Sequence, residues 1–198
     1  MIPIKLLLDA YQTGLFPMAV DGCIQWFSPS RRGVLPLDRL HVSKRLRRVL
    51  RQGKFRHTIN QAFPDVISAC ASRPDDVGNW INGELIDSYL ALHVAGFAHS
   101  VEVWSGQRLV GGLYGVSLHG AFFGESMFHI VTDASKIALC KLVERLQQRS
   151  YRLLDVQWVT PHLARLGAIE IGRREYLATL DLAMKMRCQF GDQIEDLR

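Results

Sequence analysis

Two carboxylates and one amide lie in segments of the chain that otherwise read as buried strands. Glu125 lies among three phenylalanines and a methionine in residues 121–128. A carboxylate in such surroundings costs several kcal/mol unless it is neutralised, paired or hydrogen-bonded. Asp155 and Gln157 lie two positions apart in another apolar stretch, so both side chains leave the strand on the same face, with Cα atoms about 7 Å apart. These three residues are the best candidates for an active site.

Structural roles remain open for each of these residues taken singly. Glu125 could form a structural salt bridge, and Asp155 could cap a neighbouring loop at a strand end. It is less expected that Glu125 and Asp155 are both purely structural when Gln157 lies beside Asp155. Trp80 lies in a loop between glycine and asparagine residues. It could plug the core, or it could be a platform on which a base stacks.

Other catalytic patterns are poorly supported. The seven histidines form no H-E-x-x-H motif and no i, i+4 pair, so no metal site is predicted. Ser126 lies in Gly-Glu-Ser-Met rather than in a G-x-S-x-G turn, which argues against a serine hydrolase. Cys140 falls in a helical pattern and fits a core residue better than a nucleophile.

The overall composition is that of a soluble globular protein. The 198 residues are 48% hydrophobic and 22% charged, which suits one large domain, or one domain with a small appendage. No apolar run approaches the ~20 residues of a membrane span, and the first residues do not resemble a signal peptide. The four cysteines are far apart, which favours a reducing cytosol over a disulfide framework. The expectation is therefore a cytoplasmic protein that does not contact a membrane.

Positive charge is concentrated in one part of the chain. Between Arg31 and Arg56 there are ten Lys or Arg residues and one acidic residue, Asp38. Ser43 is the predicted N-cap of a helix over 44–52, with its apolar residues on one side. A solvated helix face is the simple interpretation, but no acidic residue interrupts the cluster, so binding of a polyanion is preferred. The predicted phosphate-binding residues are Lys44, Arg45, Arg47, Arg48 and Arg51.

Apolar spacing and turn residues predict alternating helices and strands. Tight turns at Ser105-Gly106 and His119-Gly120 predict an antiparallel meander of three strands. Asp133 is predicted to cap the helix that follows, and prolines favour sheet-edge positions for the extended pieces at 26–29 and 34–37. The predicted helices cover 4–13, 44–52, 61–72, 84–95, 134–149, a short segment after Thr160-Pro161, and a last one from 173. The predicted strands cover 55–59, 98–104, 108–118, 121–128, the segment with Asp155 and Gln157, and 168–172.

This order predicts an α/β (α+β) mixed sheet with helices on its faces. The order resembles the acetyltransferase-like fold that uses acyl-coenzyme A. Those proteins hold pyrophosphate on a glycine-rich turn at a helix N-terminus. The turn at 129–133 has no glycine and carries an acid instead, so coenzyme A binding is rejected while the fold is kept.

Several motifs together resemble the bacterial leucyl/phenylalanyl-tRNA–protein transferase family. The resemblance covers nearly the whole chain, and its motifs occur in order. They are Ala10-Tyr11 leading into Gly14-Leu15-Phe16-Pro17, His-Ser-Val-Glu-Val-Trp at 99–104, Leu-Val-Gly-Gly-Leu-Tyr-Gly at 109–115, Gly-Glu-Ser-Met-Phe at 124–128, and Asp-Val-Gln at 155–157 followed by Thr160 and His162-Leu163.

The resemblance implies an enzyme that moves Leu or Phe, and sometimes Met, from aminoacyl-tRNA to a protein whose N-terminus is Arg or Lys. The new N-terminal residue marks that protein for degradation. The family uses no metal or coenzyme. It has a smaller N-terminal domain, here placed at residues 1–35, and an acetyltransferase-like catalytic domain, here placed at 36–198. A monomer is expected.

The resemblance also assigns roles to individual residues. Asp155 and Gln157 match the family's proposed catalytic pair, and Glu125 matches an active-site carboxylate. Trp80 matches an aromatic residue near the terminal adenosine of the tRNA, and Met18 stands where some members have a second tryptophan. The predicted substrate-binding residues are Trp80, Met18, Tyr11, Tyr89, Leu113, Phe122 and Met127, of which the last three belong to the apolar amino-acid pocket.

Two other classes of function share parts of this pattern. An acyl-coenzyme A-dependent N-acetyltransferase would share the sheet, and a non-catalytic RNA-binding module would share the basic helix. A binding module gains nothing from carboxylates in an apolar cleft, which argues against the second. The cation that Glu125 would hold stays open between the α-ammonium of the donor amino acid and the basic side chain of the acceptor.

Overall fold

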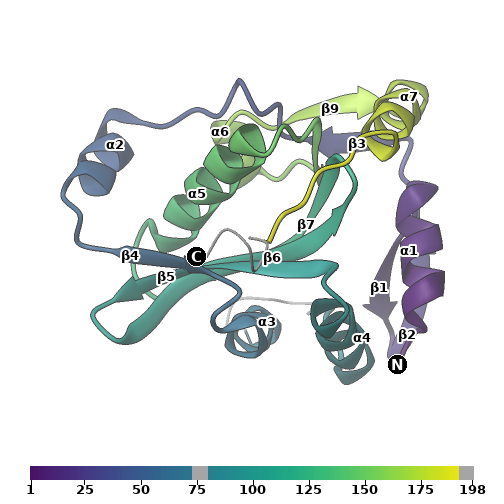
Figure 1. The fold of residues 1–198 in the computed structure, drawn as a ribbon, viewed down its shortest axis with the longest axis horizontal. Helices are drawn as coiled ribbons and strands as arrows, with labels where there is room; N and C mark the ends of the chain where they lie inside the picture. The colour runs from purple at the N-terminus through teal and green to yellow at the C-terminus, as the bar shows by residue number, and fades with distance from the viewer. Residues whose placement is uncertain (73–79, 192–198) are drawn as a thin grey trace.

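The computed structural model describes residues 1–72 and 80–191 and is built on one large sheet. Seven strands form this mixed sheet in the order β4-β5-β6-β7-β8-β3-β9, with helices on both faces (Figure 1). This confirms the predicted α/β class. The strands of the sheet are β3 (Arg31–Val34), β4 (Arg56–Ile59), β5 (Ala98–Ser105), β6 (Arg108–Leu118), β7 (Ala121–His129), β8 (Leu153–Gln157) and β9 (Ile169–Gly172).

The helices enclose one apolar core on each face of the sheet. On one face, α3 and α4 bury Phe63, Val66 and Tyr89. On the other face, α5 buries Ile137 and Leu142. Figure 1 shows α3 and α4 on the opposite side of the sheet from α5. The helices are α1 (Ile4–Gln12), α2 (Lys44–Arg51), α3 (Phe63–Ala71), α4 (Gly83–Val94), α5 (Ala134–Gln148), α6 (Pro161–Arg165) and α7 (Arg173–Met184).

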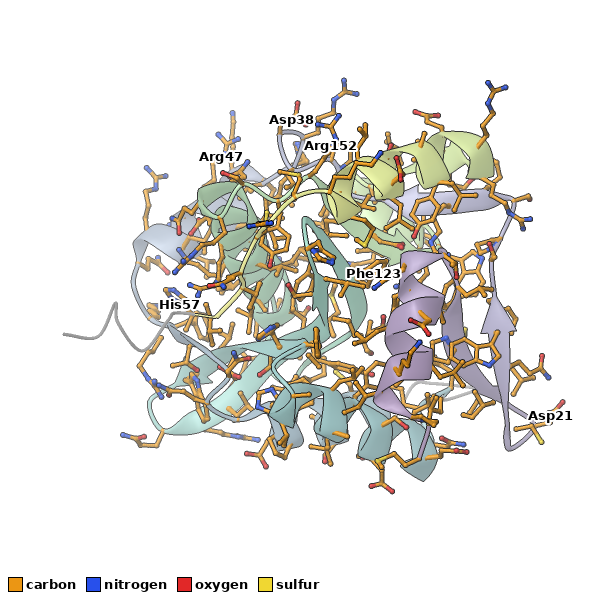
Figure 2. All side chains as sticks on the ribbon, turned by 45° about the vertical axis from the view of Figure 1, so that its right-hand side comes forward. Asp21, Asp38, Arg47, His57, Phe123 and Arg152 are labelled. Atoms are coloured by element: carbon orange, nitrogen blue, oxygen red, sulfur yellow. The ribbon has the colours of Figure 1, made fainter. Side chains whose placement is uncertain are left out.

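The strands joined by tight turns pair in the antiparallel direction in two parts of the molecule. The predicted meander is confirmed, because β5 pairs with β6 and β6 with β7, both antiparallel. Near the N-terminus, β1 (Phe16–Val20) and β2 (Cys23–Phe27) form a separate two-stranded sheet. Figure 2 shows Asp21 at the outer end of this hairpin and Phe123 of β7 in the interior of the molecule.

The position of β3 corrects one prediction. An edge position was expected for the extended piece at 34–37, but only Val34 of this piece lies in a strand, and that strand, β3, pairs with β8 on one side and β9 on the other. The proline rule is not violated, since the strand ends at Val34 and Pro36 follows it. The division into residues 1–35 and 36–198 stays a prediction, and β3 lies in the first of these ranges while both its partners lie in the second.

The structure at the start of α5 corrects another prediction. Asp133 was predicted to cap this helix, but its backbone is left-handed at φ 71° and its side chain makes no capping hydrogen bond. Instead, the carboxylate accepts from Arg45 at 2.8 Å and from Lys136 at 2.9 Å. The other predicted caps are confirmed, because the side chains of Ser43 and Thr160 accept from backbone N–H groups in the first turns of α2 and α6.

Candidate active site

A cavity of about 650 Å³ opens where two neighbouring strands separate. Strands β7 and β8 are parallel and pair only over three positions, the last being Phe123 with Asp155. Beyond this level, β7 continues against β6 and β8 against β3. Both strands therefore turn side chains into the space between them. Gly124, Glu125, Ser126 and Met127 come from β7, and Val156 and Gln157 come from β8.

Both strands are irregular at this level. In β7, Tyr114 and Gly115 of β6 pair with Ser126 and Gly124, so Glu125 is the extra residue of a β-bulge. In β8, the pairing with β3 shifts in the same way around Val156. Such bulges re-aim side chains and are common beside active sites. They explain why a charged residue and an amide enter the cavity from strands whose other residues are apolar.

Asp155 lies behind the wall of the cavity, fully buried. Its carboxylate accepts from Arg32 Nε at 2.9 and 3.1 Å and from Arg32 Nη2 at 2.7 Å. The hydroxyl of Tyr176 donates to Oδ2 at 2.7 Å. Burial lowers the pKa of Arg32, but the attraction of Asp155 outweighs it and the pKa is raised overall. The guanidinium of Arg32 therefore stays charged at every pH near neutrality.

Arg32 is held by more than Asp155. Its Nη1 donates to the carbonyl of Gly14 at 3.1 Å, and the guanidinium lies between the rings of Phe16 and Tyr176, 4.4 and 4.6 Å from their centroids. Sequence reasoning counted Arg32 within the exposed basic block, which was wrong for this residue. Arg32, Gly33 and Val34 are buried in succession, so β3 has no alternating pattern that could have identified Arg32 from the sequence.

Asp155 orients Gln157 through the backbone rather than through the amide. The N–H of Gln157 donates to Asp155 Oδ1 at 2.9 Å, and Gln157 adopts a left-handed φ of 56°. Such a conformation costs about 1–3 kcal/mol in a residue other than glycine and marks functional sites. At Gly33 a Cβ would lie 2.8 Å from the carbonyl carbon of Trp158, so only glycine allows the β8 chain to turn here.

The amide of Gln157 spans the gap between the parted strands. In the orientation that matches donors with acceptors, Nε2 donates to the carbonyls of Gly124 at 2.9 Å and Val156 at 3.2 Å. The amide is therefore held by one backbone carbonyl of each of the two strands. With its nitrogen held by two carbonyls, the amide oxygen is the atom that can accept a hydrogen bond from a substrate.

Glu125 meets two tyrosines on its inner side. Tyr11 of α1 donates to Oε1 at 2.8 Å, and Tyr89 of α4 donates to Oε2 at 2.9 Å. The two hydroxyls are 2.7 Å apart. Burial raises the pKa of Glu125 to about 7, and the two tyrosine hydrogen bonds only partly oppose this. Tyr11 and Tyr89, predicted as substrate-binding residues, are fully buried and support Glu125 from behind.

Most of the predicted apolar pocket is brought together. Leu113 and Met127 line the cavity. Phe122 does not: it is fully buried and packs against Phe190, with ring centroids 5.0 Å apart. Sequence reasoning missed further apolar lining residues, among them Leu139 and Leu142 of α5 and Leu154 of β8. Their helical and strand patterns indicated core positions and gave no sign of a cavity.

The two residues predicted to hold the terminal adenosine, Met18 and Trp80, both line the cavity. They lie close together along the chain's fold, because the Trp80 carbonyl accepts from the N–H of Ala19 at 3.0 Å. Trp158, which sequence reasoning did not single out, also lines the cavity and is 39% exposed. Its ring is nearly perpendicular to that of Phe16, with the two ring centroids 4.9 Å apart. An exposed tryptophan directly after Gln157 was the available signal.

The basic helix α2 is apolar on one side and charged on the other. Leu46 faces the core, while the side chains of Lys44, Arg47, Arg48 and Arg51 are exposed. Arg45 is 65% exposed and pairs with Asp133, so an acid absent from the local sequence does reach this cluster. Figure 2 shows Arg47 at the periphery of the molecule.

Two searches of the described part of the chain bear on other kinds of site. Within residues 1–72 and 80–191, no group of three or more His, Cys, Asp or Glu side chains is placed to hold a metal ion. Over the same residues, no helix combines the length and apolarity that a membrane crossing requires.

The protein thus combines an α/β sheet with an apolar cavity whose wall carries the amide of Gln157 and the carboxyl group of Glu125. The family model described as "Leucyl/phenylalanyl-tRNA protein transferase" matches residues 34–181, and that of the "Leucyl/phenylalanyl-tRNA protein transferase N-terminal domain" matches residues 1–30. The chain therefore belongs to the leucyl/phenylalanyl-tRNA protein transferase family, which confirms the predicted resemblance.

Individual relatives are similar over most of their length. A protein of Phenylobacterium zucineum (strain HLK1) named leucyl/phenylalanyl-tRNA–protein transferase is 54% identical over 188 residues, which is 93% of this chain and 85% of that protein. A protein of the same name from Synechocystis sp. is 46% identical over 194 residues, covering 97% of this chain and 96% of that protein. A solved GCN5-related N-acetyltransferase-like protein from Streptococcus suis 89/1591 has a TM-score of 0.40 at 14% identity, over 84% of this chain and 63% of that one.

Proposed function

We propose that this protein transfers Leu or Phe from aminoacyl-tRNA to the N-terminal Arg or Lys of acceptor proteins. The observation that carries the proposal is the cavity between β7 and β8, where an apolar lining for the amino acid meets the amide of Gln157. The product carries a new apolar N-terminal residue, which marks it for degradation. We further propose that the protein works as a monomer in the cytoplasm.

The chemistry that the site must support is aminolysis of an ester that is already activated. The α-amine of the acceptor has a pKa near 8, so a useful fraction is neutral at pH 7 and needs no strong base. Alignment of the amine with the ester carbonyl is the main requirement. The amide oxygen of Gln157 accepts an N–H of the amine and directs its lone pair. The amine attacks the carbonyl carbon and forms the C–N bond, the C–O bond of the ester breaks, and the ribose oxygen leaves with a proton given up by the amine.

Asp155 and Arg32 act behind Gln157 in this mechanism. Their buried pair fixes the Gln157 backbone, so the amide does not need to reorganise as charge develops on the attacking nitrogen. Since Asp155 does not line the cavity, it is a positioning residue and does not touch the reacting atoms.

The donor pocket and the adenosine site lie at different parts of the cavity lining. Leu113, Met127 and the α5 leucines favour an apolar side chain such as that of Leu or Phe, and the flexible thioether of Met127 tolerates both shapes. The base of the terminal nucleotide is assigned to Trp80 and Met18.

The experiment that tests the proposed function compares two acceptors. Labelled Phe-tRNA is incubated with the protein and a peptide that begins with Arg, and then with the same peptide beginning with Ala. We expect label only in the first peptide. Label from acetyl-coenzyme A instead would support the alternative acetyltransferase, and no transfer from either donor would contradict the proposal.

A charge-reversal experiment tests the role of α2. Exposed cationic side chains that contact phosphates release counterions, so binding weakens as salt rises. Changing Arg47, Arg48 and Arg51 to Glu is expected to weaken tRNA binding more than tenfold and to flatten the plot of log affinity against log salt. The matched control reverses three exposed arginines elsewhere, Arg108, Arg152 and Arg174, and should leave both quantities nearly unchanged. An unaltered slope in the α2 variant would place the tRNA on another surface.

A further inference from the structure

The hydroxyls of Tyr11 and Tyr89 and the carboxyl group of Glu125 form a closed ring of short contacts. The three oxygen–oxygen distances are 2.7, 2.8 and 2.9 Å, each that of a hydrogen bond. Each tyrosine supplies one proton. If both donate to an ionised carboxylate, none remains for the contact between the two hydroxyls. Three hydrogen bonds need three protons, so the third must come from the carboxyl group itself.

The surroundings of this ring agree with a neutral carboxyl group. The charged or titratable groups that act on the ring are Arg32 of β3, Asp155 of β8, Tyr114 of β6 and Tyr176 of α7. Arg32 and Asp155 neutralise each other. No described residue forms an ion pair with Glu125, and burial disfavours its charged form.

We propose that Glu125, Tyr11 and Tyr89 form a proton-sharing cluster that is neutral in the free protein and ionises when a primary ammonium group enters the cavity. Glu125 is the sole acidic residue among the described residues that line the cavity, and it is a near neighbour of the apolar lining residue Met127. The ligand class is therefore a primary ammonium attached to an apolar side chain. Its identity as the donor's α-ammonium rests on the proposed function.

The step balances without any other reactant. The neutral carboxyl group loses its proton to water at the cavity mouth, and no covalent bond other than O–H changes. The tyrosine that had accepted from the carboxyl group then turns its hydroxyl, so that both Tyr11 and Tyr89 donate to the carboxylate, and the carboxylate gains the ammonium as its counterion. The contact between the two hydroxyls then no longer holds a proton and lengthens. A neutral ligand of the same shape does not drive this ionisation.

The first test follows Glu125 in the free protein. The protein is labelled with [δ-13C]glutamate, and the carboxyl signals are recorded from about pH 5 to about pH 9. We expect one signal with a midpoint near pH 7 that is absent from the Glu125→Gln variant. Glutamine can both donate and accept in the ring, so this variant is expected to fold. Titration of every signal in the ordinary glutamate range, about 4.3, would overturn the proposal.

The second test adds a cation. Saturating phenylalaninol, which carries a primary ammonium beside a phenyl ring, is expected to lower the Glu125 midpoint by about one pH unit, equivalent to a tenfold preference for the ionised form. The uncharged 3-phenyl-1-propanol should leave it unchanged. Equal effects of the two compounds, or none, would overturn the coupling. Neither measurement needs tRNA, so a failure here is distinguishable from failure of Phe transfer, which would contradict only the proposed function.

Discussion

Replacing Arg32 with methionine is expected to lower the free energy of unfolding by about 3–5 kcal/mol, because Asp155 would be left charged and buried without its cation. Arg32 and Asp155 are 1% and 0% exposed, so water cannot replace the lost partner. Urea unfolding followed by tryptophan fluorescence measures the change. The matched control is Arg31→Met, since Arg31 is the adjacent residue, 62% exposed, and pairs with Glu170 at 3.6 Å on the surface. That change should cost less than about 1 kcal/mol.

A double variant separates stability from activity at this pair. Changing Arg32 to Met and Asp155 to Leu together removes both charges, and much of the lost stability is expected to return. Transfer of Phe should not return, because the N–H of Gln157 loses its acceptor. If Arg32→Met alone costs less than about 1 kcal/mol, the buried pair does not organise this part of the sheet.

Single-turnover transfer of Phe is expected to slow by about 10- to 100-fold in Gln157→Ala and Asp155→Asn, with tRNA binding unchanged. The first change removes the amide that aligns the attacking amine. The second keeps the shape of the side chain but removes the charge that anchors Arg32 and, through the backbone, Gln157. Rapid-quench measurement at saturating Phe-tRNA isolates the chemical step.

Matched controls for these two variants lie on the surface. Gln147→Ala removes an exposed amide that donates to the carbonyl of Leu37, and Asp181→Asn removes an exposed carboxylate that pairs with Lys185. Both should leave the rate unchanged. A loss of less than tenfold in both site variants would contradict the positioning role of Gln157 and Asp155.

Much of the fold could be predicted from the sequence because its signals are local. Turn glycines and period-two apolar patterns predicted the meander β5-β6-β7, and Ser43 and Thr160 predicted two helix starts. The interior position of β3 could not be found in this way. Four residues with two arginines and one glycine look like a polar connection, and their partners lie far along the chain.

In the candidate site too, some residues could be predicted from local sequence signals and others could not. Glu125, Asp155 and Gln157 were identifiable because polar groups in apolar strands are costly unless they have a purpose. Arg32 was missed because a basic residue in a basic segment carries no such signal. The hydrogen bonds of Asp155 and Gln157 were also unpredictable, since they depend on a bulge and a left-handed backbone that no residue pattern encodes.

The insertion of β3 between β8 and β9 has a consequence for how the protein is made. Arg32 and its carboxylate partner are 123 positions apart, so β3 leaves the ribosome long before either neighbouring strand has been synthesised. Pairing over such a sequence distance is slow, because a large loop must close first. The wall behind Gln157 is therefore completed only after β8 and β9 have emerged, and a nascent or truncated chain that lacks these strands also lacks the Asp155 and Gln157 part of the candidate active site.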